Sequence, residues 1–120
     1  MADLALEVNR GDAVSLNVGP VLDAAGAVVN ITGYELWFTG KLAVSDLDAA
    51  AVFQKTTTAG SIVITNGPAG LARVDLAAAD TSALTSSTLL YVDLQAKASG
   101  KVVTLARGRL LVVADVTRAA

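Results

Sequence analysis

Short runs of alternating apolar and polar residues recur about every ten residues along the chain, separated by Gly, Asn, Asp, Pro and Ser. Alternation with a period of two places successive side chains on opposite faces of a β-strand, and helical periodicity is nearly absent. Turn residues at this spacing are typical of an antiparallel sandwich or barrel. The pattern predicts an all-β domain with strands at residues 4–8, 14–18, 34–39, 51–56, 61–65, 71–76, 90–97 and 102–113.

The most regular alternations indicate which side chains face the core. Residues 72–76 and 90–97 alternate without interruption, so one face of each strand is expected to be buried. The inward side chains expected there are Ala72, Val74, Leu76, Leu90, Val92, Leu94 and Ala96. With the other strands, this predicts about seven to nine strands in one domain, with no linker and no internal repeat.

Several connections carry distinct signals. Residues 66–70, with the sequence Asn-Gly-Pro-Ala-Gly, give the strongest turn signal and predict a hairpin. Residues 80–84 are expected to form an Asp-capped helical turn that joins the two sheets. Residues 41–51 are ambiguous between an Ala-rich helix and a loop, and we expect them to be the longest connection. Gly108 predicts a bulge or bend in the last strand.

Composition limits the chemistry that the chain can carry. It has 120 residues, no cysteine and no histidine, which excludes disulfides, Cys/His zinc sites and catalysis that needs either residue. Eleven acidic and nine scattered basic residues argue against a nucleic-acid surface. No apolar run approaches the roughly 20 residues of a membrane span, and the start of the chain is acidic where a secretory signal is basic. We therefore expect neither a membrane segment nor a cleaved leader.

The acidic residues do not converge on a recognisable site. Asp46 and Asp48 form an Asp-x-Asp pair, but calcium needs six to eight oxygen ligands and no further acids lie near this pair in the sequence. Residues 66–70 lack the Gly-Lys-Ser/Thr ending of a phosphate-binding loop and lead into a strand. We expect no metal, no cofactor, no catalytic residue and no enzymatic activity.

Two aromatic residues are candidates for partner contacts. If Leu36 and Phe38 point inward, Trp37 lies on the opposite face, where an exposed Trp marks a protein or sugar contact. A shift of one residue would place Trp37 in the core instead, and both alternatives stay open. Tyr91 is expected to be a contact, or else a strand-surface or corner tyrosine.

Both ends of the chain supply further interface candidates. The N-terminal candidates are Leu4, Leu6 and Val8. They belong either to a first strand or to an arm that adds to a neighbour's sheet. Near the C-terminus, Arg118 joins Arg107 and Arg109 in a mild basic cluster, which is either a solvated face or a contact.

Several stretches together resemble one known pattern. They are Gly11-Asp12, Asp23 to Gly26 followed by Ile31-Thr32-Gly33, Asp80-Thr81-Ser82-Ala83-Leu84, Tyr91-Val92-Asp93-Leu94-Gln95, Gly108-Arg109-Leu110 and Asp115-Val116-Thr117-Arg118. In order and spacing, across nearly the whole chain, they resemble the immunoglobulin-like N-terminal domain of the phage baseplate upper protein family and related small immunoglobulin-like virion proteins of tailed bacteriophages. The family usually continues past the last motif into a receptor-carrying region, whereas this sequence ends at Ala120, and residues 85–90 lack a glycine that the family often has.

The resemblance implies an immunoglobulin-like antiparallel β-sandwich that serves assembly rather than catalysis. It implies a virion protein made in the host bacterial cytoplasm, located at the baseplate or tail, present in multiple symmetric copies and bound to other virion proteins. A capsid-decoration or neck protein, with the major capsid protein as partner, is the first alternative. A carbohydrate-binding module is the second, with Trp37 and either Tyr34 or Tyr91 as its aromatic platform.

Overall fold

The structure, a computed structural model, describes residues 2–23, 25–43, 45, 51–82, 84, 87–98 and 101–113. These residues form eight strands and one helical turn. In chain order they are β1 (Ala2–Asn9), β2 (Val14–Val18), β3 (Glu35–Lys41), β4 (Phe53–Thr56), β5 (Ile62–Asn66), β6 (Leu71–Leu76), α1 (Ala78–Thr81), β7 (Thr88–Ala98) and β8 (Lys101–Val113). The all-β prediction is confirmed.

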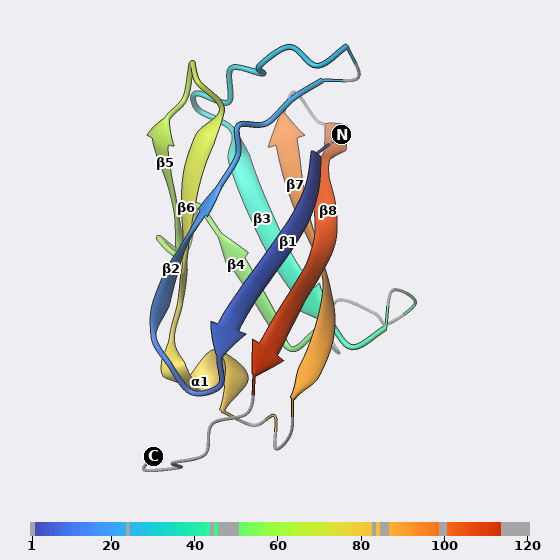
Figure 1. Cartoon of the computed structure of the whole chain (residues 1–120). Coiled ribbons are helices and arrows are strands. Elements are labelled where there is room, and N and C mark those ends of the chain that lie inside the picture. The colour runs from blue at the N-terminus through green and yellow to red at the C-terminus, as the bar shows by residue number, and fades with distance from the viewer. Residues whose placement is uncertain are drawn as a thin grey trace.

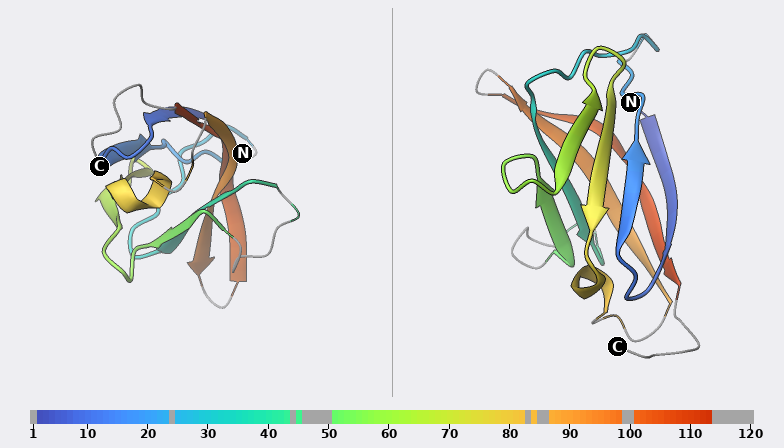
Figure 2. Two further views of the ribbon diagram at one scale, coloured as in Figure 1. Left: turned by 90° about the horizontal axis from the view of Figure 1, so that it is seen from below. Right: turned by 90° about the vertical axis from the view of Figure 1, so that its left-hand side faces the viewer.

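The strands form two sheets with the core between them (Figure 1). The larger sheet has five strands in the order β1-β8-β7-β3-β4, and the smaller has three in the order β2-β6-β5. Figure 2 shows the larger sheet curving around the smaller one. All seven side chains expected inward from β6 and β7 are buried, with 3% or less of each exposed.

A glycine makes room for the aromatic part of the core. The rings of Phe38 and Phe53 stack with centroids 5.9 Å apart and an angle of 19° between their planes. A Cβ atom on Gly40 would lie 2.6 Å from the Phe53 ring. The close pairing of β3 with β4 at Gly40 and Phe53 therefore depends on the missing side chain.

The prediction of a wholly antiparallel sandwich is wrong at the N-terminal strand. β1 runs parallel to β8, with Leu6 opposite Leu110 and Val8 opposite Val112. Strands this far apart in sequence are not joined by a hairpin, so no short turn constrains their relative direction. The other strand pairs are antiparallel.

The irregularity of β8 lies before Gly108, so the prediction of a bulge at this glycine is wrong. The register shifts between Leu94 and Gln95 of β7, which leaves Leu105 as the additional residue on β8. Leu105 and Ala106 are consecutive and both buried, as expected where a bulge turns two neighbouring side chains to one side. Gly108 itself pairs in regular register.

Two further predictions need correction. The helical turn spans Ala78–Thr81, so it begins before the expected residues 80–84. Asp80 does not precede the turn as its cap; its Oδ2 accepts a hydrogen bond from the Ala77 N–H at 2.6 Å. The longest connection is residues 19–34 between β2 and β3, not residues 41–51. Residues 44 and 46–50 of the latter lie outside the described residues.

Residues 19–34 close one end of the sandwich through backbone contacts with the β5–β6 turn (Figure 1). The Val21 N–H donates to the Gly70 carbonyl and the Ile31 N–H donates to the Gly67 carbonyl, both at 3.0 Å. Val21 and Ile31 are almost fully buried in the core. Gly70 has a φ of +69°, and a Cβ there would lie 2.9 Å from the Val21 nitrogen. A side chain at Gly70 is therefore excluded twice, by conformation and by space.

The opposite end is closed by side chains that join α1 to the β1–β2 turn. The Arg10 guanidinium donates hydrogen bonds to the carbonyls of Ser82 and Leu84. The Gly11 N–H donates to the buried Thr81 hydroxyl at 2.9 Å. These contacts fix α1 at this end of the sandwich, where Figure 1 shows it below β2 and β6.

Candidate functional site

The outer face of the five-stranded sheet, directed away from the three-stranded sheet, carries the largest group of exposed apolar side chains on adjacent strands. Leu89 of β7 lies opposite Leu111 of β8, and Tyr91 lies opposite Arg109 in the next outward-facing pair. Leu89, Tyr91 and Leu111 have exposed fractions of 41%, 38% and 36%. We call these four residues the Tyr91 patch. Tyr and Arg beside exposed apolar side chains are the residue types that dominate protein–protein contacts.

The surroundings of the Tyr91 patch are charged. Tyr91 lies between Lys41 of β3 and Arg109 of β8 in the sheet register. In the next outward pair, Asp93 lies opposite Arg107. The predicted grouping of Arg107 with Arg109 is thus present on one face, because both belong to β8 with the same orientation. Arg118 lies outside the described residues.

Sequence reasoning missed the two leucines of the patch. Leu89 precedes the buried Leu90, and Leu111 follows the buried Leu110. The resulting runs of apolar residues hide the alternation at these positions. The signal that identifies Leu89 is its shared phase with Tyr91, Asp93 and Gln95 along β7. An apolar residue in the outward phase marks it as a candidate contact.

Trp37 lies on the outer face of the same sheet, as the outward alternative predicted. Leu36 and Phe38 are fully buried, whereas Trp37 is half-buried and pairs with Thr56 and Gln95 on the neighbouring strands. The alternative that places Trp37 in the core is wrong.

Hydrogen bonds fix the position of the Trp37 ring. Its Nε1–H donates to Glu35 Oε1 at 3.1 Å, and the Thr58 hydroxyl donates to the same oxygen at 3.2 Å. This ring is therefore held among polar side chains. Its role as a contact stays a prediction.

Trp37 and Tyr91 do not share one aromatic platform. Tyr91 pairs with Lys41, which is four residues along β3 from Trp37, so about 13 Å of strand separates the two aromatic residues. Tyr34, the third candidate, packs against the core. The three aromatic residues thus lie apart, which weakens the case for the flat sugar-binding surface that a carbohydrate-binding module uses.

The N-terminal candidates belong to a strand of the chain's own sheet. Val8 is buried and Leu6 is half-buried against the core, while Leu4 pairs in register with Gly108. The choice between strand and arm is therefore settled in favour of the strand β1. Beyond these side chains, β1 offers the backbone of a sheet edge.

The acidic residues form no metal site within the described part of the chain. No group of three or more acidic side chains converges there, and Asp46 and Asp48 lie outside it. Residues 66–70 form the β5–β6 turn, in which Asn66 Oδ1 accepts a hydrogen bond from the Ala69 N–H at 3.2 Å. The predicted hairpin is confirmed. The described residues include no helix with the length and apolar character to cross a membrane.

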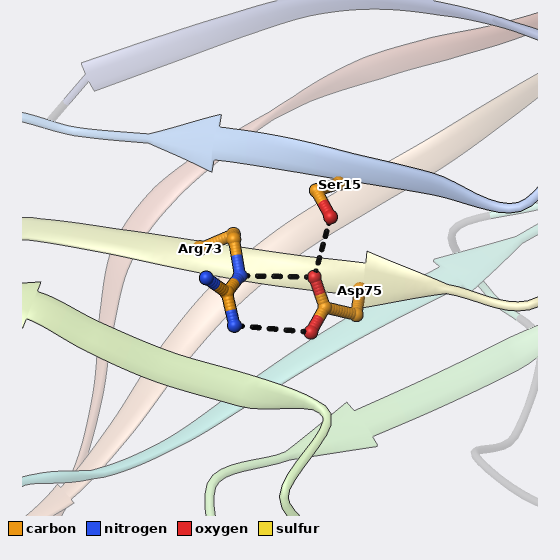
Figure 3. A network of polar contacts seen from close by, with 3 residues as sticks. All are labelled: Ser15, Arg73 and Asp75. Carbon is orange, nitrogen blue, oxygen red and sulfur yellow. Dashed lines mark hydrogen bonds and ion pairs between the residues drawn. The ribbon is translucent and has the colours of Figure 1, made fainter.

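One exposed polar network lies on the three-stranded sheet (Figure 3). The Ser15 hydroxyl donates to Asp75 Oδ1 at 2.8 Å, and Arg73 Nε approaches the same oxygen at 3.1 Å. The Ser15 hydrogen bond, followed by the hydrogen bond and positive charge of Arg73, lowers the pKa of Asp75 below its ordinary value, although partial burial opposes the shift. The network joins β2 to β6. The Asp75 carboxylate beside the Ser15 hydroxyl has a lowered pKa and is therefore a weak base, so the network resembles a structural contact rather than an active site.

Comparisons with known proteins find a likeness to a phage structure. No protein-family model matches the chain, and no curated protein matches it. Among solved structures, the chain is similar to the N-terminal domain of phage TP901-1 ORF48, with a TM-score of 0.51 and 8% sequence identity. The likeness covers 96% of this chain and 89% of that domain. At this identity it shows the fold alone: the chain shares its fold with a phage protein domain.

Proposed function

We propose that the chain is a non-enzymatic structural protein of a tailed-phage virion, a module that assembles at the baseplate or tail and connects neighbouring proteins. The observation that carries this proposal is the fold shared with the phage TP901-1 ORF48 domain over 96% of the chain. The sequence resemblance to the baseplate upper protein family points in the same direction. No cluster of three or more acidic side chains in the described residues competes with it.

The strand order supports an immunoglobulin-like type for the sandwich. In that type, strands B, E and D share one sheet, and strands C, F and G form the centre of the other. β2, β6 and β5 follow the first order, and β3, β7 and β8 follow the second, with β4 added beside β3. Immunoglobulin-like modules present loops, edges and sheet faces to partners, which suits an adaptor.

The decisive experiment locates the chain in the particle. Virions of the phage that encodes it are disrupted and separated into heads and tails, and each fraction is searched for the 12.1 kDa chain by mass spectrometry. Recovery with tails supports the proposal. Recovery with heads replaces it with a capsid-decoration or neck role, and absence from both fractions overturns the virion role.

The Tyr91 patch is the surface that we expect to contact a neighbour in the particle. Tyr91→Ala should reduce incorporation into tails, because it removes the aromatic centre of the patch. Val63→Ala is a matched control, since Val63 is equally exposed at 39% but lies on the edge strand β5 of the other sheet. Equal incorporation of both variants would exclude this patch as the contact.

A further inference from the structure

The two sheets have four edges, and three of them carry features that discourage pairing with another chain. β4 is only four residues long, and β2 has five residues. β5 is irregular, with a register shift between Ile64 and Asn66. Short strands and bulges are ordinary ways in which proteins protect sheet edges.

The fourth edge, β1, lacks these features. It has eight residues, and all eight pair with β8 in unbroken register. Its sequence, Ala-Asp-Leu-Ala-Leu-Glu-Val-Asn, contains no proline, glycine, lysine or arginine. Among the described strands, none pairs with the side of β1 that faces away from β8. Alternate backbone N–H and carbonyl groups of β1 therefore have no partner among the described strands along that side.

The partial exposure of Leu6 is a second indication that a partner strand covers this edge. It lies at the centre of β1 and packs against the core, but it remains half-buried because the sheet ends beside it. Ala5 and Glu7, its neighbours along the strand, are exposed. An added strand would cover the rest of Leu6 and satisfy the open backbone groups.

We propose that a second copy of this chain adds to β1, so that the two β1 strands pair antiparallel about a two-fold axis at Leu6. A two-fold axis perpendicular to the sheet makes the pair antiparallel and keeps both outer faces on the same side. The five-stranded sheets of the two copies then form one continuous sheet. This proposal goes beyond the virion role and does not depend on it.

The charges on β1 exclude the two registers next to the one centred on Leu6. With the axis at Ala5, Glu7 lies opposite Asp3 of the second copy, and with the axis at Glu7 the two Glu7 residues lie opposite each other. Like charges in these positions destabilise a strand pair. With the axis at Leu6, Glu7 lies opposite Ala5 of the second copy and the two Leu6 residues meet. No two acidic residues are then directly opposite.

The first test is a cross-link. The chain has no cysteine, so Leu6→Cys introduces a unique thiol at the axis. Mild oxidation should give a disulfide-linked dimer in high yield. Glu7→Cys should cross-link poorly, because its two copies are offset along the strands beyond the Cα separation of roughly 7 Å that a disulfide spans. Val63→Cys on the edge strand β5 controls for random collision.

Three results would overturn the proposal. They are a monomer for Leu6→Cys, cross-linking of Val63→Cys to the same extent, and a higher yield for Glu7→Cys than for Leu6→Cys. Thermal unfolding under reducing conditions shows whether each variant is folded.

The second test uses the natural side chain at Leu6 and a matched pair of variants. Ala5→Lys places a cation opposite Glu7 of the second copy, and Ala5→Glu places an anion there. Sedimentation equilibrium should show dimerisation strengthened about fivefold by Ala5→Lys and weakened about fivefold by Ala5→Glu. Within one copy, Ala5 pairs with Arg109. Ala5→Lys should therefore lower the free energy of unfolding of the single chain, and Ala5→Glu should raise it.

Dimer affinity and fold stability are therefore expected to change with opposite signs, which a merely structural effect of residue 5 cannot produce. No dimer at the highest soluble concentration, or a dimer affinity that follows fold stability, overturns the proposal. Both experiments use the purified chain. Their failure therefore leaves the location of the chain in the virion to be decided separately.

Discussion

The two ends of the sandwich are closed by different means (Figure 1). At one end, residues 19–34 lie against the β5–β6 turn, and glycines allow backbone to touch backbone. At the other end, the side chains of Arg10, Thr81, Lys55 and Asp80 join α1 to the sheets. Side chains can change rotamer to accommodate a substitution, whereas backbones in contact move only if their strands move. We therefore expect the glycine end to tolerate substitution less well.

The largest effect is expected for Gly70→Ala. A φ of +69° is unfavourable for alanine, and the new Cβ would lie 2.9 Å from Val21 N and 3.0 Å from Val29 O. Conformational strain and overlap together should lower the free energy of unfolding by about 3 kcal/mol, measured by chemical denaturation.

Gly26→Ala separates the two causes. Gly26 has a similar φ of +82°, but a Cβ there meets no atom within 4 Å. Gly26→Ala should lower the free energy of unfolding only by the conformational cost, about 1 kcal/mol. If both variants lose the same free energy, the backbone contact at Gly70 is not a constraint and the contrast between the two ends disappears.

Arg10→Met tests the helix end and should have the next largest effect. Methionine keeps much of the side-chain length but removes the donors to the Ser82 and Leu84 carbonyls. Because these bonds are charge-assisted and half-buried, we expect a loss of about 2 kcal/mol in the free energy of unfolding.

Arg10→Lys is the matched variant for this site. It retains the positive charge, but an ammonium group does not provide the fixed fork that reaches two carbonyls at once. Its free energy of unfolding should lie between those of the wild type and Arg10→Met. A value equal to the wild type would show that charge alone, not the paired geometry, holds this end.

Lys55→Met should have a smaller effect at the same end. Lys55 Nζ lies 2.7 Å from Asp80 Oδ2, and each side chain is 16% exposed. Since Asp80 keeps its hydrogen bond from the Ala77 N–H, we expect a loss of about 1 kcal/mol by chemical denaturation. Asp80→Ala loses both contacts and should cost more. If it costs no more than Lys55→Met, the bond to Ala77 contributes nothing to this end.

The sequence predicts the sheets far better than it predicts these ends. Alternation identifies β6 and β7 and their inward side chains, because burial of one face imposes a period of two. It does not indicate that β1 runs parallel to β8, since that depends on a contact between distant segments. The turn at residues 66–70 is evident from its glycines and proline, but the role of Gly70 in receiving residues 19–34 is a tertiary contact with no local signal.

The candidate surface is predicted only in part, for a similar reason. The outward position of Trp37 follows from the burial of Leu36 and Phe38. Leu89 and Leu111 escape notice, because whether an apolar residue in an apolar run is buried depends on what covers its strand. The exposed edge of β1 likewise becomes visible only when the order of strands in the sheet is known.

The smallest effect on the free energy of unfolding is expected for substitution of Asp75. Asp75 lies at neither end of the sandwich, so its contacts show what a surface polar network contributes. Ser15 and Arg73 hold its pKa below the ordinary value of 3.8, so ionised Asp75 stabilises the fold above that pH, and this contribution is lost as the pH falls through the lowered pKa. Asp75→Asn should therefore be less stable than the wild type near neutral pH, and the difference should vanish in acid. Ser15→Ala should reproduce part of the effect. Chemical denaturation near neutral pH and in acid measures the difference in the free energy of unfolding between each variant and the wild type. If that difference does not change with pH, the effect comes from packing and not from the charge of Asp75.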